Sequence, residues 1–184
     1  MDVTELISGF GSEVKCRTYL EHLRWPNGVR CIRCDASKGI SRIEQRGQFE
    51  CDSCGYQFSV RVGTIFQASH LPLWKWFMAA YLMIGSEGGV SADRLSRLLG
   101  MSHKTAWYLC HRIRAAMRGE ALGAVDADAV GGSHRRVSAK HLSAYLDEMA
   151  FLSNNQNNAY LLRDLLLRLL DSESITYAEL IASA

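Results

Sequence analysis

Apolar residues recur along most of the chain at the spacing of an α-helix, and strand-like alternation is limited to two short stretches. Residues 3–23 have the helical spacing, interrupted by Gly9 and Gly11, so an N-terminal helix is predicted. Residues 56–62 alternate between apolar and polar side chains, which predicts a strand. Residues 71–84 are densely apolar and aromatic, which predicts a core helix rather than a platform for stacking bases.

Residues 91–118 are predicted to form two short helices joined by a tight turn. Ser91 and Ser102 are suited to cap the two helices, and Gly100 is suited to begin the turn between them. This is the plan of a helix-turn-helix motif, in which the front of the second helix meets base edges and basic residues behind it meet phosphates. The candidate DNA-binding residues of this helix are His103, Lys104, Thr105, Arg112 and Arg114. An ordinary helical hairpin with a solvated basic face is the alternative.

The last third of the chain begins with a glycine-containing link, in which residues 125–130 alternate like a strand. Asp128 and a neighbouring aspartate would share one face of that strand, but two carboxylates alone are too common to define a metal site. A helix is predicted to follow, with four side chains turned inward: Leu142, Tyr145, Leu146 and Met149. An amphipathic helix is predicted over residues 160–170, and residues 174–184 are expected to be a frayed end.

Four of the six cysteines form two Cys-x-x-Cys pairs, Cys31 with Cys34 and Cys51 with Cys54. Two such pairs can supply four thiolates in a tetrahedron, which is typical of a closed structural zinc site. Too few apolar residues lie between the pairs to form a core, so a structural Zn²⁺ ion is expected to hold this segment together. Two disulfides, which need an oxidising compartment, and four free thiols are the alternatives.

Composition and charge narrow the class of protein. Nearly half of the 184 residues are apolar, 48%, which predicts a globular chain, and no apolar run is long enough to predict a membrane span. The first 13 residues contain no basic segment followed by an apolar run, so no export signal is expected. Residues 1–120 hold 16 Lys or Arg against 11 Asp or Glu, whereas residues 121–184 hold five against eight. Nucleic-acid contacts are therefore expected within the basic residues 1–120. Arg33 and Arg61, near the cysteine pairs, are among the candidates.

Several independent motifs of the front part follow one another in a characteristic order. They are Trp25-Pro26-x-Gly28, the two cysteine pairs, Gln57-Phe58-Ser59, Gly63-Thr64, Pro72-Leu73-x-x-Trp76-Phe77 and the helix-turn-helix sequence from Leu98 to Trp107. Residues 15–118 thereby resemble the N-terminal region of bacterial insertion-sequence transposases that carry a zinc ribbon before a DDE-type core. Ile32 stands where the family usually has proline. Residues 130–155 are similar to the segment that follows the last catalytic acid in such transposases.

The resemblance implies an RNase H-like catalytic core between the two similar regions, but only about a dozen residues lie there. Asp128 matches the first catalytic aspartate, and the other two acids have no counterpart. Two-metal cleavage of a phosphodiester needs several carboxylates, so the hypothesis is an internally deleted transposase that binds double-stranded DNA at the ends of its element. Mg²⁺ would be needed only if catalysis survives. The alternatives are an active transposase completed by another subunit, and a non-enzymatic zinc-ribbon regulator or protein-docking module.

The predicted fold class is α+β and mostly helical, a zinc ribbon followed by a helix-turn-helix domain and a short helical remnant. The predicted parts are an N-terminal helix over 1–24, a zinc ribbon over 25–66, a helix-turn-helix domain over 71–118, a linker with a remnant of the catalytic strand over 119–137, and a helical tail over 138–184. Without the catalytic sheet, the tail leucines would lack a partner, so the hypothesis includes a homodimer or association with full-length transposase. A cytoplasmic, nucleoid-associated bacterial protein is expected, with no membrane partner.

Overall fold

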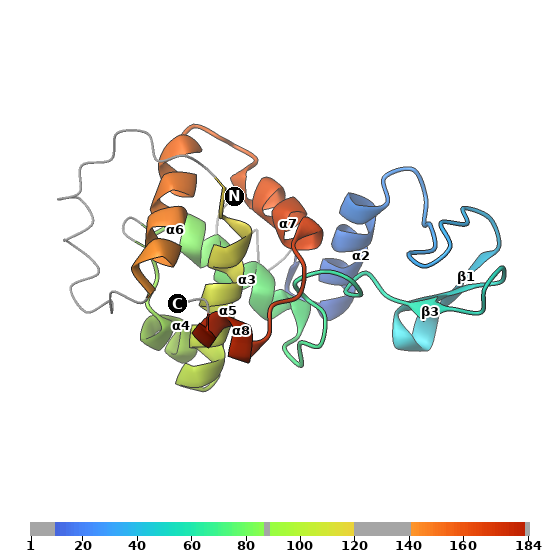
Figure 1. The fold of residues 1–184 in the computed structure, drawn as a ribbon, viewed down its shortest axis with the longest axis horizontal. Helices are drawn as coiled ribbons and strands as arrows, with labels where there is room; N and C mark the ends of the chain where they lie inside the picture. The colour runs from blue at the N-terminus through green and yellow to red at the C-terminus, as the bar shows by residue number, and fades with distance from the viewer. Residues whose placement is uncertain (1–9, 87–88, 120–140, 183–184) are drawn as a thin grey trace.

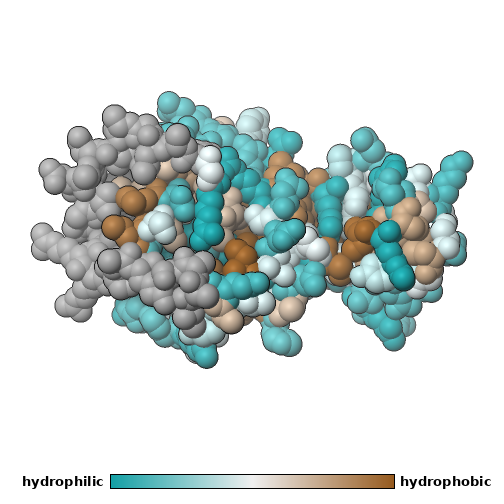
Figure 2. Space-filling model, in the orientation of Figure 1, coloured by the Kyte–Doolittle hydropathy of each residue, from teal (hydrophilic) through white to brown (hydrophobic). Residues whose placement is uncertain are grey.

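The computed structural model describes residues 10–86, 89–119 and 141–182, which form a group of helices and a small three-stranded sheet. The sheet lies at one end of an elongated molecule, and helix α2 stands between it and the remaining helices (Figure 1). Figure 2 shows the molecule narrowing between the two parts. The predicted α+β, mostly helical class is confirmed. Among the described helices, none combines the length and the apolar character that crossing a bilayer requires.

Helix α2 spans Glu13–Arg24 and begins two residues after Gly11, the second of the two predicted helix-breaking glycines. The Ser12 hydroxyl accepts a hydrogen bond from the Lys15 backbone N–H at 3.2 Å, which caps the helix. Cys16 is fully buried on its inner face, as expected of a packing residue, and burial raises the pKa of its thiol to about 12. The first nine residues lie outside the described part of the chain, so the predicted helix is tested only from residue 10 onward.

The sheet is an antiparallel meander in the order β1-β2-β3. Its elements are β1 (Ile40–Ile43), the 3₁₀ turn η1 (Glu44–Arg46), β2 (Gln48–Cys51) and β3 (Gln57–Phe58). Trp25 packs edge-on against Phe49 and Phe58, with ring centroids 5.5 and 5.9 Å apart. These three rings are the main apolar contacts of the ribbon, a core too small to fold a domain without further help.

The strand predicted over residues 56–62 is wrong beyond Phe58, because the chain turns instead of pairing. Consecutive turns follow, with hydrogen bonds from the N–H groups of Val62 and Thr64 to the carbonyls three residues earlier. The Arg24 guanidinium donates to the carbonyls of Val60 and Val62 at 2.7 and 2.8 Å. This arginine therefore satisfies backbone groups that a neighbouring strand would otherwise have satisfied.

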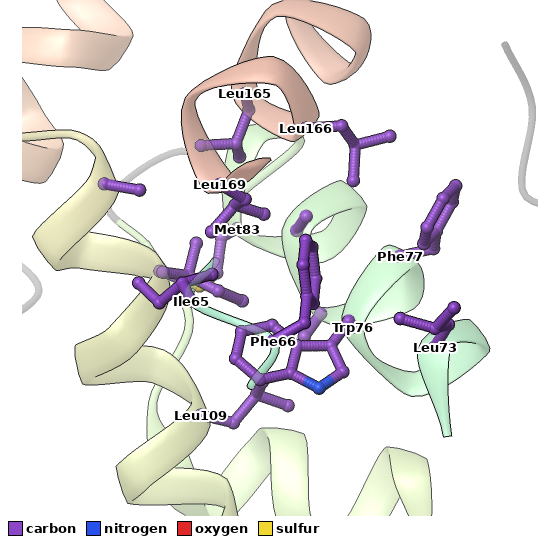
Figure 3. Packing of buried hydrophobic residues seen from close by; sticks show 14 of the residues in the cluster. Ile65, Phe66, Leu73, Trp76, Phe77, Met83, Leu109, Leu165, Leu166 and Leu169 are labelled. Atoms are coloured by element: carbon purple, nitrogen blue, oxygen red, sulfur yellow. The ribbon is translucent and has the colours of Figure 1, made fainter. Parts of the chain in front are cut away.

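Helix α3, Leu73–Ile84, lies at the centre of the main core and begins after Pro72 at the N-cap. Trp76 and Phe77 are 1% and 0% exposed, which confirms that the aromatic stripe is core. Figure 3 shows residues from four parts of the chain meeting around this helix. They are Ile65 and Phe66 from the preceding turns, Leu73, Trp76, Phe77 and Met83 from α3, Leu109 from α5, and Leu165, Leu166 and Leu169 from α7.

Helices α4 (Ala92–Leu99) and α5 (His103–Ala116) agree with the predicted helix pair. Ser91 and Ser102 each accept a hydrogen bond from the backbone N–H three residues later, both at 3.2 Å. Gly100 has φ 57° and ψ 56°, a left-handed conformation that ends α4 with little steric cost only for glycine. The caps and the turn therefore form for the reasons that the sequence indicated.

Helix α6, Leu142–Asn154, exposes a different face from the one predicted. Leu142 is 39% exposed, and Tyr145, Leu146 and Met149 are only half-buried. The deeply buried positions are instead Ala144, Glu148, Ala150 and Phe151. A pattern of apolar residues could not identify this face, because a carboxylate with an arginine partner lies at its centre.

Helices α7 (Leu161–Asp171) and α8 (Tyr177–Ala182) correct two further expectations about the tail. Four leucines of α7 were predicted to lack a partner, but they are at most 9% exposed and belong to the main core: Leu162, Leu165, Leu166 and Leu169. The expected frayed end contains α8, whose Leu180 is 5% exposed. The Tyr108 hydroxyl donates to the Ile175 carbonyl at 2.6 Å and so holds this segment against α5.

Candidate metal centre and nucleic-acid interface

The two cysteine pairs lie in two turns of the same shape. In each turn the N–H of the first cysteine bonds to a carbonyl five residues later, Ala36 or Tyr56, at 2.9 or 3.1 Å. The residue four positions after the first cysteine, Asp35 or Gly55, has a positive φ near 60° and bonds back to the carbonyl of that cysteine. The repeated backbone explains how two separate sequence stretches present their sulfurs to one point.

The four sulfur atoms lie within 4.8 Å of one another. Cys31 Sγ is 3.7 Å from Cys54 Sγ, and Cys34 Sγ is 3.6 Å from Cys51 Sγ. A disulfide would need about 2.05 Å, so neither pair is bonded. A tetrahedron with metal–sulfur bonds of about 2.3 Å has edges of about 3.8 Å, and the observed separations fit that geometry.

The local electrostatics favour thiolate formation at one corner of the cluster. Burial would raise the pKa of Cys31, but the backbone N–H groups of Cys34 and Arg33 and the neighbouring thiols lower it to about 6. The Ala36 N–H favours a thiolate at Cys34, yet the surrounding thiols outweigh it and raise that pKa to about 12. The thiols of the cluster thus oppose one another's deprotonation. A divalent cation would remove this opposition, because it stabilises all four thiolates together. The donor set and the geometry fit zinc in a site with no open position.

The helix-turn-helix presents the front of α5 at the surface. His103 and Lys104 are exposed, as the prediction requires of groove-reading residues. Thr105 is half-buried, and its hydroxyl lies 2.8 Å from the capping hydroxyl of Ser102. Thr105 therefore takes part in capping α5. His103 and Lys104 are the two accessible residues at the front of this helix.

Three of the predicted phosphate contacts have a different environment from the one expected. Arg112 is 3% exposed, donates to the Gln67 carbonyl at 3.2 Å and lies over the Trp76 ring. Arg114 is 1% exposed and donates to Glu148 Oε2 at 2.8 Å. Arg61 is paired with Glu13 and donates to two backbone carbonyls. These guanidinium groups hold elements together. Arg112 and Arg114 lie on buried positions of α5, whereas Arg61 lies in the turns that follow β3.

Arg33 and Lys75 are two further cations whose side chains are exposed or half-exposed. Arg33 is exposed on the ribbon, with its guanidinium carbon 5.7 Å from the Tyr56 ring centroid. Lys75, which the sequence did not single out, donates to the Gly100 carbonyl at 3.2 Å and therefore lies beside the turn of the helix-turn-helix. No local signal could have found Lys75, because it lies on α3, far from the motif in the sequence.

Comparison with known proteins places these features in context. Residues 11–57 match the family model of the transposase zinc-ribbon domain, and this range contains α2 and all four cysteines of the cluster. A protein of Halobacterium salinarum, described as an uncharacterized protein in transposable element ISH50, is 33% identical over 115 residues. The chain is insertion-sequence transposase-like.

The similarity to the Halobacterium protein covers 60% of the transposase-like chain and 38% of that relative. The chain therefore spans well under half of the length of the relative it matches. No solved structure matches the chain. Together the two sequence matches support a transposase-related role.

The predicted catalytic remnant lies outside the described residues. Asp128 and the strand proposed around it belong to residues 120–140, and the end of the linker and the start of the tail lie there as well. Among the residues that the structure does describe, the four cysteines are the one group of three or more metal-ligating side chains that converge on a point.

Proposed function

We propose that this chain is a DNA-binding protein of transposase type, which recognises the ends of an insertion sequence in DNA transposition. The observation that carries the proposal is the capped helix-turn-helix, with His103 and Lys104 exposed at the front of α5, in a chain that also has a transposase-type ribbon. The proposed place of action is the nucleoid, in the cytoplasm, where the DNA of the element lies.

In this proposal a zinc ion held by Cys31, Cys34, Cys51 and Cys54 stabilises the ribbon and takes no part in chemistry. The ribbon would add phosphate contacts through Arg33, whose side chain is exposed on the surface. Lys75 would contact a phosphate beside the turn, and Lys104, at the start of α5, would contact a phosphate at the edge of the groove that this helix enters.

We further propose that the chain is catalytically defective. The sequence between the two regions that resemble transposases is too short for a catalytic core, and Asp128 alone could not hold two Mg²⁺ ions. The alternative is a transposase completed by another subunit. A DNA fragment that flanks the gene, incubated with the zinc-loaded protein and Mn²⁺, separates the two: a shifted band without cutting supports the proposal. Cutting that Asp128→Ala removes would establish the alternative.

The DNA-binding proposal is tested by the salt dependence of affinity. Lys104→Ala should weaken binding to a duplex of the flanking DNA and lower the slope of log K against log salt by about one unit, because one phosphate contact is lost. Arg163→Ala is the matched control, since it removes one exposed positive charge from α7. Fluorescence anisotropy at several salt concentrations measures both. Equal slopes in the two variants, or no binding by the unmodified protein, would contradict the proposal.

A further inference from the structure

The outer face of α5 is covered by the end of the chain, residues 172–182, called here the C-terminal segment. The Tyr177 ring packs edge-on against Trp107 and Tyr108, with centroids 5.8 and 5.9 Å apart. Lys104 Nζ lies 4.8 Å from the centroid of the same ring. The Tyr108 hydroxyl donates to the Ile175 carbonyl at 2.6 Å. Figure 1 shows α8 next to α5, within the helical part of the molecule.

The covered residues belong to the face that a recognition helix turns toward DNA. Positions 104, 107 and 108 lie together on one side of α5, whereas Ala106, Leu109 and Cys110 are buried in the main core on the other side. The major groove is about 12 Å wide and admits a single helix with its side chains. The Tyr177 ring occupies the side of α5 at positions 104, 107 and 108, so the groove would have to admit this ring and its helix together with α5. Helix α5 cannot enter the groove at these positions while α8 remains in place.

The C-terminal segment carries negative charge, as DNA does. The segment contains Glu173 and Glu179 and no lysine, arginine or histidine. It lies against a helix N-terminus with two exposed basic-type residues, His103 and Lys104, where the helix dipole is positive. The segment and DNA phosphates thus carry charge of the same sign, and Glu179 itself accepts a hydrogen bond from the Thr176 N–H within the segment.

We propose that the C-terminal segment is an intramolecular cover, which competes with DNA for the outer face of α5 and lowers the affinity of the intact chain. This inference rests on the proposed DNA-binding function and specifies how that site is regulated. Release of the cover exposes Trp107 and Tyr108 and frees the exposed Lys104 from its contact with the Tyr177 ring. Added DNA and the cover are then mutually exclusive occupants of one surface.

The construction of the segment suits reversible release. Helix α8 has only six residues and has little stability of its own. It is attached by few side chains, with Tyr177 still 39% exposed and Leu180 5% exposed. Helix α7, which precedes it, is held in the main core by its leucines, and Ile175 of the segment packs against the outside of that core, so detachment uncovers Ile175 and leaves α7 in place.

The test compares variants of the full zinc-loaded chain on a mixed-sequence duplex of about 30 base pairs. Tyr177→Ala, which removes the ring that contacts α5, should tighten binding about fivefold. Deletion of residues 176–184, which keeps Ile175, should tighten it about tenfold or more. Tyr160→Ala, a control that removes a tyrosine 68% exposed on another surface, should bind as the unmodified protein does.

The outcomes separate the inference from the function on which it rests. Tighter binding by Tyr177→Ala and by the deletion, lost again when Lys104→Ala is added, supports both. Equal affinities in the intact chain, Tyr177→Ala and the deletion, all weakened by Lys104→Ala, would leave the DNA-binding function standing and overturn the cover. If neither uncovered variant binds any duplex, the proposed function fails and the cover fails with it.

Amide hydrogen exchange gives a second test, which uses the unmodified protein and therefore does not require any variant to fold. The Leu180 N–H is bonded to the Thr176 carbonyl at 3.1 Å and reports on α8. Saturating duplex should speed exchange at residues 177–182 and slow it at residues 103–108. Unchanged or slower exchange at residues 177–182 in the bound protein would overturn the cover, since DNA would then bind with α8 in place.

Discussion

The six cysteines divide into two groups by what surrounds each sulfur. Cys16 and Cys110 are fully buried in the main core, where burial raises the pKa of each thiol, to about 12 and about 11. The other four sulfurs lie within 4.8 Å of one another in the ribbon, where backbone N–H groups stabilise negative charge at Cys31. Identical side chains are thus packing residues in one place and members of a four-cysteine cluster that could hold a metal ion in the other.

Cys51→Ser should abolish zinc binding and unfold the ribbon. Structural zinc contributes free energy of the order of 10 kcal/mol in small sites, far more than the few aromatic contacts of the ribbon can replace. Metal content and the near-UV circular dichroism of Trp25 and its aromatic neighbours measure the change. Cys16→Ala is the control and should retain one zinc ion per chain. A Cys51→Ser protein with one bound zinc would show that the cluster is assigned wrongly.

His111 is a buried histidine that no metal or DNA role requires. It is 4% exposed and packs against Trp107, with ring centroids 4.2 Å apart. Burial, together with the positive charges of Arg114, His141 and Arg118, lowers its pKa to about 3. Its Nε2 atom has no hydrogen-bond partner within the described ranges. The neutral imidazole is therefore part of the packing between α5 and α6.

The low pKa of His111 makes stability depend on pH below about 6.5. The unfolded chain takes up this proton near pH 6.5 and the folded protein near pH 3, so stability is full above pH 6.5 and falls as the pH falls between these values. His111→Phe should reduce the loss between pH 7 and pH 5.5 by about 1 kcal/mol. Urea unfolding at both pH values measures this loss of stability. His22→Gln, a substitution at an exposed histidine, is the control. An equal loss in both variants would mean that His111 is already protonated in the folded protein.

At the level of secondary structure, the turn between α4 and α5 is set by one backbone conformation. Gly100 has φ 57°, and a side chain added there would meet no atom within 4 Å. Any loss of stability on substitution at this position therefore comes from the backbone conformation alone. The turn fixes the angle between the two helices and the position of the exposed front of α5.

Gly100→Ala should lower the free energy of unfolding by about 1 kcal/mol, because alanine is strained in the left-handed region. Gly100→Asn should cost less, since asparagine tolerates that region better. Chemical denaturation of the unmodified protein and of the two variants gives the order of their free energies of unfolding. If alanine were as stable as glycine, the turn would have to adopt a different backbone from the one described.

A second element-scale feature is the ion pair that joins α5 to α6. Arg114 donates through Nε to Glu148 at 2.8 Å and through Nη2 to the Val90 carbonyl at 3.3 Å. Burial alone would lower the pKa of Arg114, but the Glu148 carboxylate raises it and keeps the guanidinium charged. Two charges 34 residues apart in the sequence thus become a buried pair. An isolated arginine on a helix offers no sign that its partner lies on another helix.

For the molecule as a whole, the tail is part of the main core. Leu165 and Leu169 are fully buried against α3, and the leucines that were expected to seek another chain are covered within this one. They therefore no longer argue for a homodimer or for association with a full-length transposase. The helix-turn-helix and the tail share one hydrophobic core, while the ribbon has its own small cluster.

Leu165→Ala should lower the free energy of unfolding by about 2–5 kcal/mol, because it leaves a cavity beside α3. Leu142→Ala is the matched control, a leucine of α6 that is 39% exposed, and it should cost less than about 0.5 kcal/mol. Zinc content should stay at one ion in both. Similar small effects of the two substitutions would mean that α7 is not packed as described.

The sequence by itself determined the local features, because each depends on residues that are near one another in the chain. The cysteine spacing predicted the convergence of four sulfur atoms, and two serines and Gly100 predicted the caps and the turn of the helix-turn-helix. The apolar and aromatic density of residues 71–84 predicted a core helix, which the structure places at Leu73–Ile84. Each of these was set by backbone conformation or by a short-range pattern.

Only the tertiary structure decided which side chains face inward where a long-range partner is involved. Arg61, Arg112 and Arg114 were expected at the surface and are instead held by carbonyls, a ring and carboxylates from distant segments. The inner face of α6 was missed because Glu148 is buried only through its arginine. Lys75 and Tyr177 come to lie beside the helix-turn-helix through packing of α3 and α8, which no local pattern encodes.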